Sequence, residues 1–121
     1  MLLLVQEKRK RSALFAVKKN NFMYATLYKT DGTIEQVAPK DGKSFFAEQL
    51  NQLVGGTFQM ITLPVDKTVF ICHDEGAIIG LPANLKAFDV WKKNFPIDEY
   101  PHNNVDMVFG DILISDRHLV E

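Results

Sequence analysis

The chain has 121 residues, a net charge of −1 and a single cysteine. This length suits one domain, residues 1–121, with its own hydrophobic core and is too short for two domains. Apolar residues make up 46% of the chain, the usual share in a globular protein, which argues against an intrinsically disordered chain. One cysteine, Cys72, excludes an internal disulfide.

The N-terminus does not look like a secretory signal, because the apolar run MLLLV precedes the basic residues instead of following them. No apolar run approaches the roughly 20 residues that a membrane-spanning helix needs. We therefore expect a cytoplasmic protein without a membrane partner.

Basic residues are concentrated at the start of the chain. Residues 1–21 hold 6 basic side chains and 1 acidic one, whereas the other hundred positions hold 8 basic and 14 acidic ones. Apolar runs at residues 2–5 and 14–17 flank the basic cluster, which favours a hairpin with a basic loop over one helix with a charged middle. The cluster either contacts nucleic acid, anionic lipid or an acidic protein patch, or is a solvated turn. Its candidate nucleic-acid-binding residues are Lys8, Arg9, Lys10 and Arg11.

A β-hairpin is predicted around Asp31-Gly32. The segment FMYATLYK, residues 22–29, alternates apolar and polar side chains, and TIEQVA, residues 33–38, resumes the strand pattern after the turn. Asp-Gly between two such runs favours a type I′ turn, which needs positive φ at both central residues.

The first helix is predicted within FFAEQLNQLV, residues 45–54. Asp41 or Ser44 can cap its N-terminus, and Gly55-Gly56 ends it because glycine accepts the left-handed conformation of a C-terminal cap. The apolar side chains that recur at helical spacing are Phe46, Leu50, Leu53 and Val54.

Three strands, residues 57–63, 68–73 and 77–81, are predicted to follow as a meander with turns at 64–67 and 74–76. Pro82 stops the third strand and Asn84 caps a second helix, which Pro96 ends. A closing strand is predicted at residues 111–115. The second helix presents Leu85, Phe88, Trp91 and Phe95 on one face.

The sequence contains no recognisable catalytic or metal-binding pattern. No pair of residues has the HxxxH, HExxH or CxxC spacing of metal ligands, so we expect neither a metal nor a cofactor. Cys72 and His73 are neighbours in a predicted strand and point to opposite faces, a poor arrangement for a nucleophile and its base. A hydrolase of a nucleotide or signalling molecule would need His73, Asp74 or Glu75 to meet a distant acid.

The segment Gly80-Leu81-Pro82-Ala83-Asn84 is the best candidate for a ligand site. A strand that passes through Gly and Pro into a helix start leaves helix amides pointing outward, where a polar ligand can bind, although Asn84 can equally spend its side chain on capping. Trp91 and Tyr100 are candidate stacking surfaces. The candidate ligand-binding residues are Gly80, Pro82, Asn84, Trp91 and Tyr100.

Several short motifs resemble, in order and spacing, the pattern of domain of unknown function 3846, a family of small proteins of bacteriophages and bacterial mobile or conjugative elements. The resemblance covers roughly residues 24–115. We therefore divide the chain into a family-like core, residues 22–115, and an N-terminal addition, residues 1–21. The motifs are Leu53-Val54-Gly55-Gly56, Asp74-Glu75-Gly76, Gly80-Leu81-Pro82-Ala83-Asn84 with Ala87, and Gly110-Asp111-Ile112.

The resemblance implies that the gene lies among phage or mobile-element genes, but it implies no established activity. Small phage and mobile-element proteins commonly bind host or defence components without catalysing a reaction. Gln59 stands where members of the family often have an acidic residue, which weakens the idea of a shared carboxylate site.

Together these features predict an α+β fold: a mainly antiparallel sheet of five or six strands with two helices packed on one face. We expect a non-enzymatic binding protein of a host or defence component or of a small polar ligand. Nucleic-acid binding through the basic segment and hydrolysis of a nucleotide are the alternatives. A homo-oligomer is also expected, because an edge strand contributed by the N-terminal segment needs covering.

Overall fold

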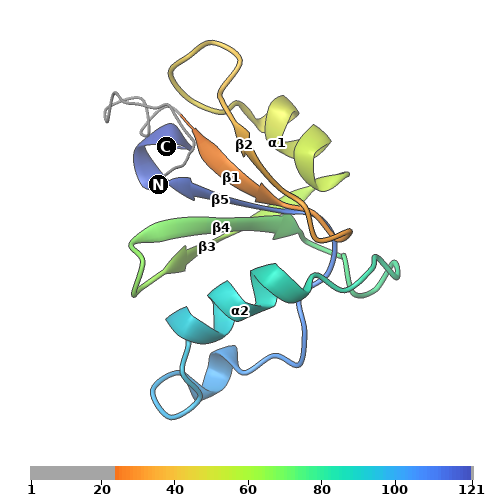
Figure 1. Ribbon diagram of the computed structural model, residues 1–121, viewed down its shortest axis with the longest axis vertical. Coiled ribbons are helices and arrows are strands. Elements are labelled where there is room, and N and C mark those ends of the chain that lie inside the picture. Colours follow the sequence, from red (N-terminus) through yellow and green to blue (C-terminus); the bar gives the residue numbers. More distant parts are fainter. Residues whose placement is uncertain (1–23, 121) are drawn as a thin grey trace.

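In the computed structural model, which describes residues 24–120, five strands form one antiparallel sheet flanked by two helices (Figure 1). The order across the sheet is β2-β1-β5-β4-β3, so the last strand of the chain lies in the centre. The predicted α+β fold, with its two helices and five antiparallel strands, is confirmed. The elements are β1 (Ala25–Tyr28), β2 (Ile34–Val37), α1 (Ala47–Val54), β3 (Phe58–Leu63), β4 (Thr68–His73), α2 (Leu85–Asn94) and β5 (Ile112–Asp116), with 3₁₀ turns at Pro101–Asn103 and Arg117–Leu119.

The two helices lie on opposite faces of the sheet, and the prediction that both pack on one face is wrong. Along β4, Val69 and Ile71 belong to the core beneath α1, whereas Phe70 belongs to the core beneath α2. In β5, Leu113 faces α1 and Ile112 faces α2. Successive strand residues point to opposite faces, so these two continuously apolar strands require a cover on each side.

Helix α1 buries Leu50 and Val54 and ends at Gly55, whose φ of 86° is the left-handed conformation predicted for the cap. Its N-terminus differs from the prediction. Phe46 is the N-cap residue and is 62% exposed, while its neighbour Phe45 enters the core. Asp41 does not reach the helix, because its carboxylate accepts hydrogen bonds from the amides of Lys43 and Ser44 and closes a turn upstream.

Helix α2 packs through an aromatic row. Trp91 lies between Phe70 and Phe95, with ring centroids 5.0 and 4.6 Å away. Such tilted and edge-on pairs are favourable beyond the area that they bury. Leu85 was predicted on this buried face, but it is 67% exposed at the helix start, and Ala87 takes the buried position.

The β1–β2 hairpin is confirmed, but its turn is not type I′. The connection covers residues 29–33, and within it Gly32, at φ 93°, is alone in having a positive φ. Asp31 has a negative φ, and its carboxylate accepts hydrogen bonds from Thr33 N and Oγ1 at 2.9 and 2.7 Å. The turn is instead closed by the Gly32 N–H, which donates to the carbonyl of Lys29.

The predicted third strand of the meander, residues 77–81, is wrong, because the segment is a compact series of turns. Ile79 N and Leu81 N donate to the carbonyls of Glu75 and Gly76, each at 3.0 Å, so the backbone satisfies itself locally. The place beside β4 is taken by β5, which pairs with it from Thr68 to Ile71. Long-range pairing with the end of the chain therefore decides the topology.

Asn94 fastens the β3–β4 turn to the end of α2. This buried side chain accepts hydrogen bonds from Val65 N and Asp66 N at 3.0 and 2.8 Å and donates to Asp66 Oδ2 and Val90 O. Lys93 Nζ lies 2.7 Å from Asp66 Oδ1. These hydrogen bonds, from Lys93 first and Asn94 second, lower the pKa of Asp66 below its ordinary value.

We predict that Asp66→Asn loses stability in a pH-dependent manner. A carboxyl whose folded-state pKa is lowered stabilises the fold above its unfolded pKa, and this contribution is lost as the pH falls through the folded-state value. The variant should therefore be about 1 kcal/mol less stable near neutral pH, with the difference closing below pH ~4. Urea unfolding at several pH values measures this. Asp98→Asn, on the exposed loop after α2, is the matched control, and an equal pH dependence in both variants would contradict the assignment.

Candidate binding surface at the loop end

One end of the sheet gathers segments that are distant in the sequence (Figure 1). The β1–β2 turn lies against the start of α2, where Lys86 Nζ donates to the carbonyl of Gly32 at 2.7 Å. The loop before α2 lies against the loop before β5, where Gly110 N donates to the carbonyl of Pro82 at 2.8 Å. We call this surface the loop end, and it comprises residues 29–33, 52–55, 76–86 and 110–111.

Asn84 holds the loop end together. Its side chain is 1% exposed, and its amide nitrogen donates to the carbonyls of Tyr28 and Gly110, both at 2.8 Å. Its side-chain oxygen accepts from Ala87 N at 3.2 Å, which confirms the predicted N-cap of α2. Both amide hydrogens and the oxygen are therefore engaged within the protein, and Asn84 acts as a cap and a cross-link.

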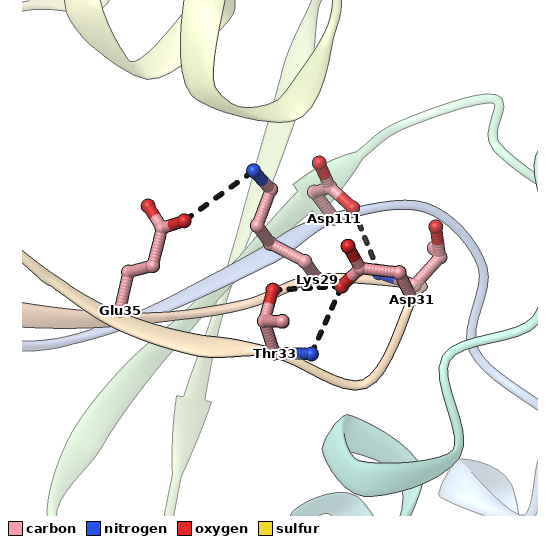
Figure 2. A network of polar contacts seen from close by, with 6 residues as sticks. Lys29, Asp31, Thr33, Glu35 and Asp111 are labelled. Atoms are coloured by element: carbon pink, nitrogen blue, oxygen red, sulfur yellow. Dashed lines mark hydrogen bonds and ion pairs between the residues drawn. The ribbon is translucent and has the colours of Figure 1, made fainter.

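Two carboxylates and the two ammonium groups of Lys29 and Lys86 lie on this surface, and Figure 2 shows the contacts of the carboxylates. Asp111 Oδ1 accepts from Thr30 N at 3.0 Å and so ties the start of β5 to the hairpin turn. The hydrogen bonds from Thr33, its hydroxyl first and its amide second, lower the pKa of Asp31. Asp31 therefore remains charged at neutral pH.

A groove of about 260 Å³ opens between α1 and the loop 76–82. The Asp111 carboxylate and the C-terminal end of α1 both border it, and the last turn of α1 contains no basic residue. A helix C-terminus carries partial negative charge, so the groove combines apolar walls with a negative edge. Its lining residues are Thr30, Gln52, Leu53, Val54, Gly55, Leu81, Pro82, Gly110 and Asp111.

Large apolar side chains project from the same surface. Ile78 is 84% exposed and Ile79 is 53% exposed, on a turn that the backbone hydrogen bonds of Ile79 and Leu81 hold in place. Leu85 projects from the first turn of α2. Adjacent exposed isoleucines on a fixed turn are characteristic of interaction surfaces rather than of solvated loops.

A second hollow, of about 240 Å³, lies on the α2 side of β3 and β4 and includes Cys72 and Trp91. Burial, and secondarily the charge of Asp74, raises the pKa of Cys72 to about 11. The group is therefore a thiol at neutral pH, the weakly nucleophilic form. Cys72 accordingly behaves as a small, half-buried apolar residue that packs against the core beneath α2.

The residues of the segment His73-Asp74-Glu75 form hydrogen bonds and packing contacts with neighbouring turns. His73 Nδ1 accepts from Glu75 N at 3.0 Å and lies 3.7 Å from Asp74 Oδ1. Asp74 Oδ1 accepts from Thr57 Oγ1 at 2.6 Å. A Cβ on Gly56 would lie 2.5 Å from His73 Nε2, so the imidazole packs where only glycine leaves room.

The five predicted ligand residues do not converge on one site. Pro82 lines the groove, Trp91 lines the second hollow, and Asn84 borders a third hollow beside the hairpin turn. Gly80 and Tyr100 line none of these three. Trp91 is 6% exposed and its Nε1 donates to the carbonyl of Asn103, while Tyr100 packs edge-on against Phe95, so both rings serve the core.

Sequence reasoning missed the two features that distinguish the loop end. Ile78 and Ile79 were assigned to the predicted strand 77–81, although their position between Gly76 and Gly80 is a signal for a turn. Asp111 was named only as part of the motif Gly110-Asp111-Ile112 and at the start of a predicted strand, with no contact predicted for it. Its proximity to Thr30 depends on the central position of β5, which no local pattern indicates.

Other kinds of site find little support in residues 24–120. This part of the chain contains no cluster of three or more His, Cys, Asp or Glu side chains arranged to hold a metal ion. None of its helices is long and apolar enough to cross a membrane. The basic candidates Lys8, Arg9, Lys10 and Arg11, and the predicted N-terminal hairpin, lie outside the described residues.

Comparison with known proteins identifies the family. The family model of DUF3846, a domain of unknown function, matches residues 23–118, so the chain belongs to this family. This confirms the resemblance found in the sequence. No curated protein and no solved structure matched the chain.

We predict that Asn84→Ala destabilises the fold by about 3 kcal/mol, because it removes three hydrogen bonds at a buried position. Asn84→Asp keeps the capping oxygen but loses both donated bonds, so it should be destabilised as well. Urea unfolding measures both effects. Asn104→Ala, at an exposed position, is the matched control. A loss at Asn84 no larger than that of the control would contradict its role as a cross-link.

Proposed function

We propose that this member of the DUF3846 family is a non-enzymatic binding protein that holds a partner protein at its loop end. The observation that carries the proposal is the pair Ile78 and Ile79, 84% and 53% exposed on a turn with a fixed backbone. Exposed apolar surface has a cost in water, which burial against a partner removes at about 25 cal/mol per Å². A pre-ordered turn also loses little conformational entropy on binding.

The groove beside this turn suggests the chemistry of the partner. Asp111 and the C-terminal end of α1 make its edge negative, while Leu53, Leu81 and Pro82 make its walls apolar. A lysine or arginine side chain fits such a groove, because its alkyl stem packs on the walls and its cation meets the carboxylate. We therefore expect a partner surface with apolar residues around at least one basic side chain.

The resemblance to phage and mobile-element proteins supplies the setting of the proposal: a cytoplasmic protein that binds a host or defence component. A small polar ligand in the same groove is the nearest alternative. Nucleic-acid binding is less well supported, because residues 22–121 hold 8 basic and 14 acidic side chains. Hydrolysis stays a prediction without a supporting cluster of side chains in the described part of the chain, since His73 and Asp74 are engaged in turn contacts.

We predict that the double variant Ile78→Ser/Ile79→Ser loses the partner while remaining folded. The two side chains project into solvent, so their replacement removes binding surface and not core. Affinity capture with the full-length protein from host-cell lysate, read by quantitative mass spectrometry, identifies proteins held by the wild type. Ile97→Ser, at an isoleucine 57% exposed after α2, is the matched control and should retain the same proteins. A partner retained equally by both variants would contradict the proposal.

With that partner in hand, Asp111→Asn tests the charge of the groove. The amide oxygen of the variant still accepts from Thr30 N, so the loop end keeps its hydrogen bond and loses the negative charge. We expect affinity to fall about tenfold and its dependence on salt to weaken, as removal of a charge-assisted contact requires. Native mass spectrometry of the full chain checks the alternative, because a retained small molecule that is lost in Asp111→Asn would favour a ligand over a protein.

A further inference from the structure

Within residues 24–120, the strand β3 forms an edge of the sheet that lacks the usual protection. It is six residues long, Phe58–Leu63, and its sequence FQMITL contains no charged residue and no proline. The opposite edge, β2, has four residues and carries Glu35, which pairs with Lys29 at 3.4 Å. Natural proteins blunt exposed edges with short strands, charges or proline to prevent pairing with another chain. β2 follows this rule and β3 does not.

The register of β3 on β4 shows which backbone groups face outward. Asp74 N donates to the carbonyl of Thr57, and these two residues stand opposite each other in the continuation of the β3–β4 register. Hydrogen-bonded and non-bonded pairs alternate along an antiparallel ladder. Phe58, Met60 and Thr62 therefore direct their N–H and C=O groups away from β4. No residue from 24 to 120 is hydrogen-bonded to these groups.

The side chains along this edge leave room for a neighbour. Met60 is 42% exposed on the α1 face, and Gln59 and Thr62 are exposed as well. Gly55 and Gly56, which precede the strand, add no side chain at its beginning. A second strand can therefore approach the full length of β3.

We propose that β3 pairs antiparallel with β3 of a second copy of this chain, which joins two sheets across a two-fold axis at Met60. In this register Met60 stands opposite Met60, and Phe58 stands opposite Thr62. Every outward N–H and C=O of the three residues then finds a partner. On the other face, Gln59 stands opposite Ile61. A shift by one residue would place the outward N–H and C=O groups of one β3 opposite residues of the other β3 whose N–H and C=O groups point back to β4. The hydrogen-bonding pattern therefore allows only registers that differ from this one by an even number of residues.

A second copy fits this edge better than a charged partner strand does. A two-fold axis places identical surfaces against each other, and this edge opposes no like charges because it carries none. Met60, the exposed apolar residue at its centre, becomes buried against its own equivalent. The interface is separate from Ile78, Ile79 and the groove. The proposed dimer and the proposed partner binding can therefore be tested independently of each other.

The test is a pair of opposite charges at position 60 in the full-length protein. Met60→Lys places two cations across the axis and Met60→Glu places two anions. Each variant alone should have the mass of one chain, 13.8 kDa, in sedimentation velocity, whereas the wild type should have the mass of two. An equimolar mixture of the two variants should restore the dimer. Gln36→Lys, exposed on the opposite edge, should leave the dimer intact.

Several outcomes would overturn the proposal. A wild-type protein that is monomeric at about 100 µM, well above the dissociation constant of a stable dimer, would do so. So would charged variants that remain dimeric, because the interface would then lie elsewhere. If the wild type is monomeric and removal of residues 1–22 produces a dimer, the N-terminal segment is the occupant of the edge instead.

Discussion

The two central strands, β4 and β5, carry large apolar side chains on both faces, and the rest of the fold follows from this constraint. Ile71 and Leu113 are fully buried beneath α1, and Phe70 and Ile112 are equally buried beneath α2. One helix cannot cover both faces of a sheet. The chain therefore places α1 and α2 on opposite sides, which brings their ends and the intervening loops to the margins of the sheet.

The loop end is one of these margins, and the buried hydrogen bonds of Asn84 add to the apolar packing there. Asn84 joins the hairpin, the loop before β5 and the first turn of α2, and residues of the same three segments also pack in the core beneath α2. Because this cross-link fixes the backbone, the turn that carries Ile78 and Ile79 can expose apolar side chains without collapsing onto the sheet. A rigid support beneath an apolar tip is the arrangement that preorganised binding requires.

Much of this fold can be predicted from local sequence signals, and the errors have a common cause. The hairpin at Asp31-Gly32, the cap at Gly55 and the cap at Asn84 each depend on residues close in sequence, and all three are present. The strand predicted at 77–81 and the one-face placement of the helices failed because both depend on β5. Its insertion between β1 and β4 is a long-range pairing. The groove was out of reach for the same reason, since Asp111 reaches Thr30 only through that pairing.

The same topology accounts for the contrast between the two edges of the sheet. The chain enters the described fold at β1, an interior strand, and its last strand fills the centre, so no described terminus remains to cover an edge. β2 is short and charged and needs no cover. β3 is longer, uncharged and open along three residues, and its hydrogen-bonding pattern is complementary to itself. Within residues 24–120, composition protects β2 but not β3, and the proposed pairing of two copies would protect β3.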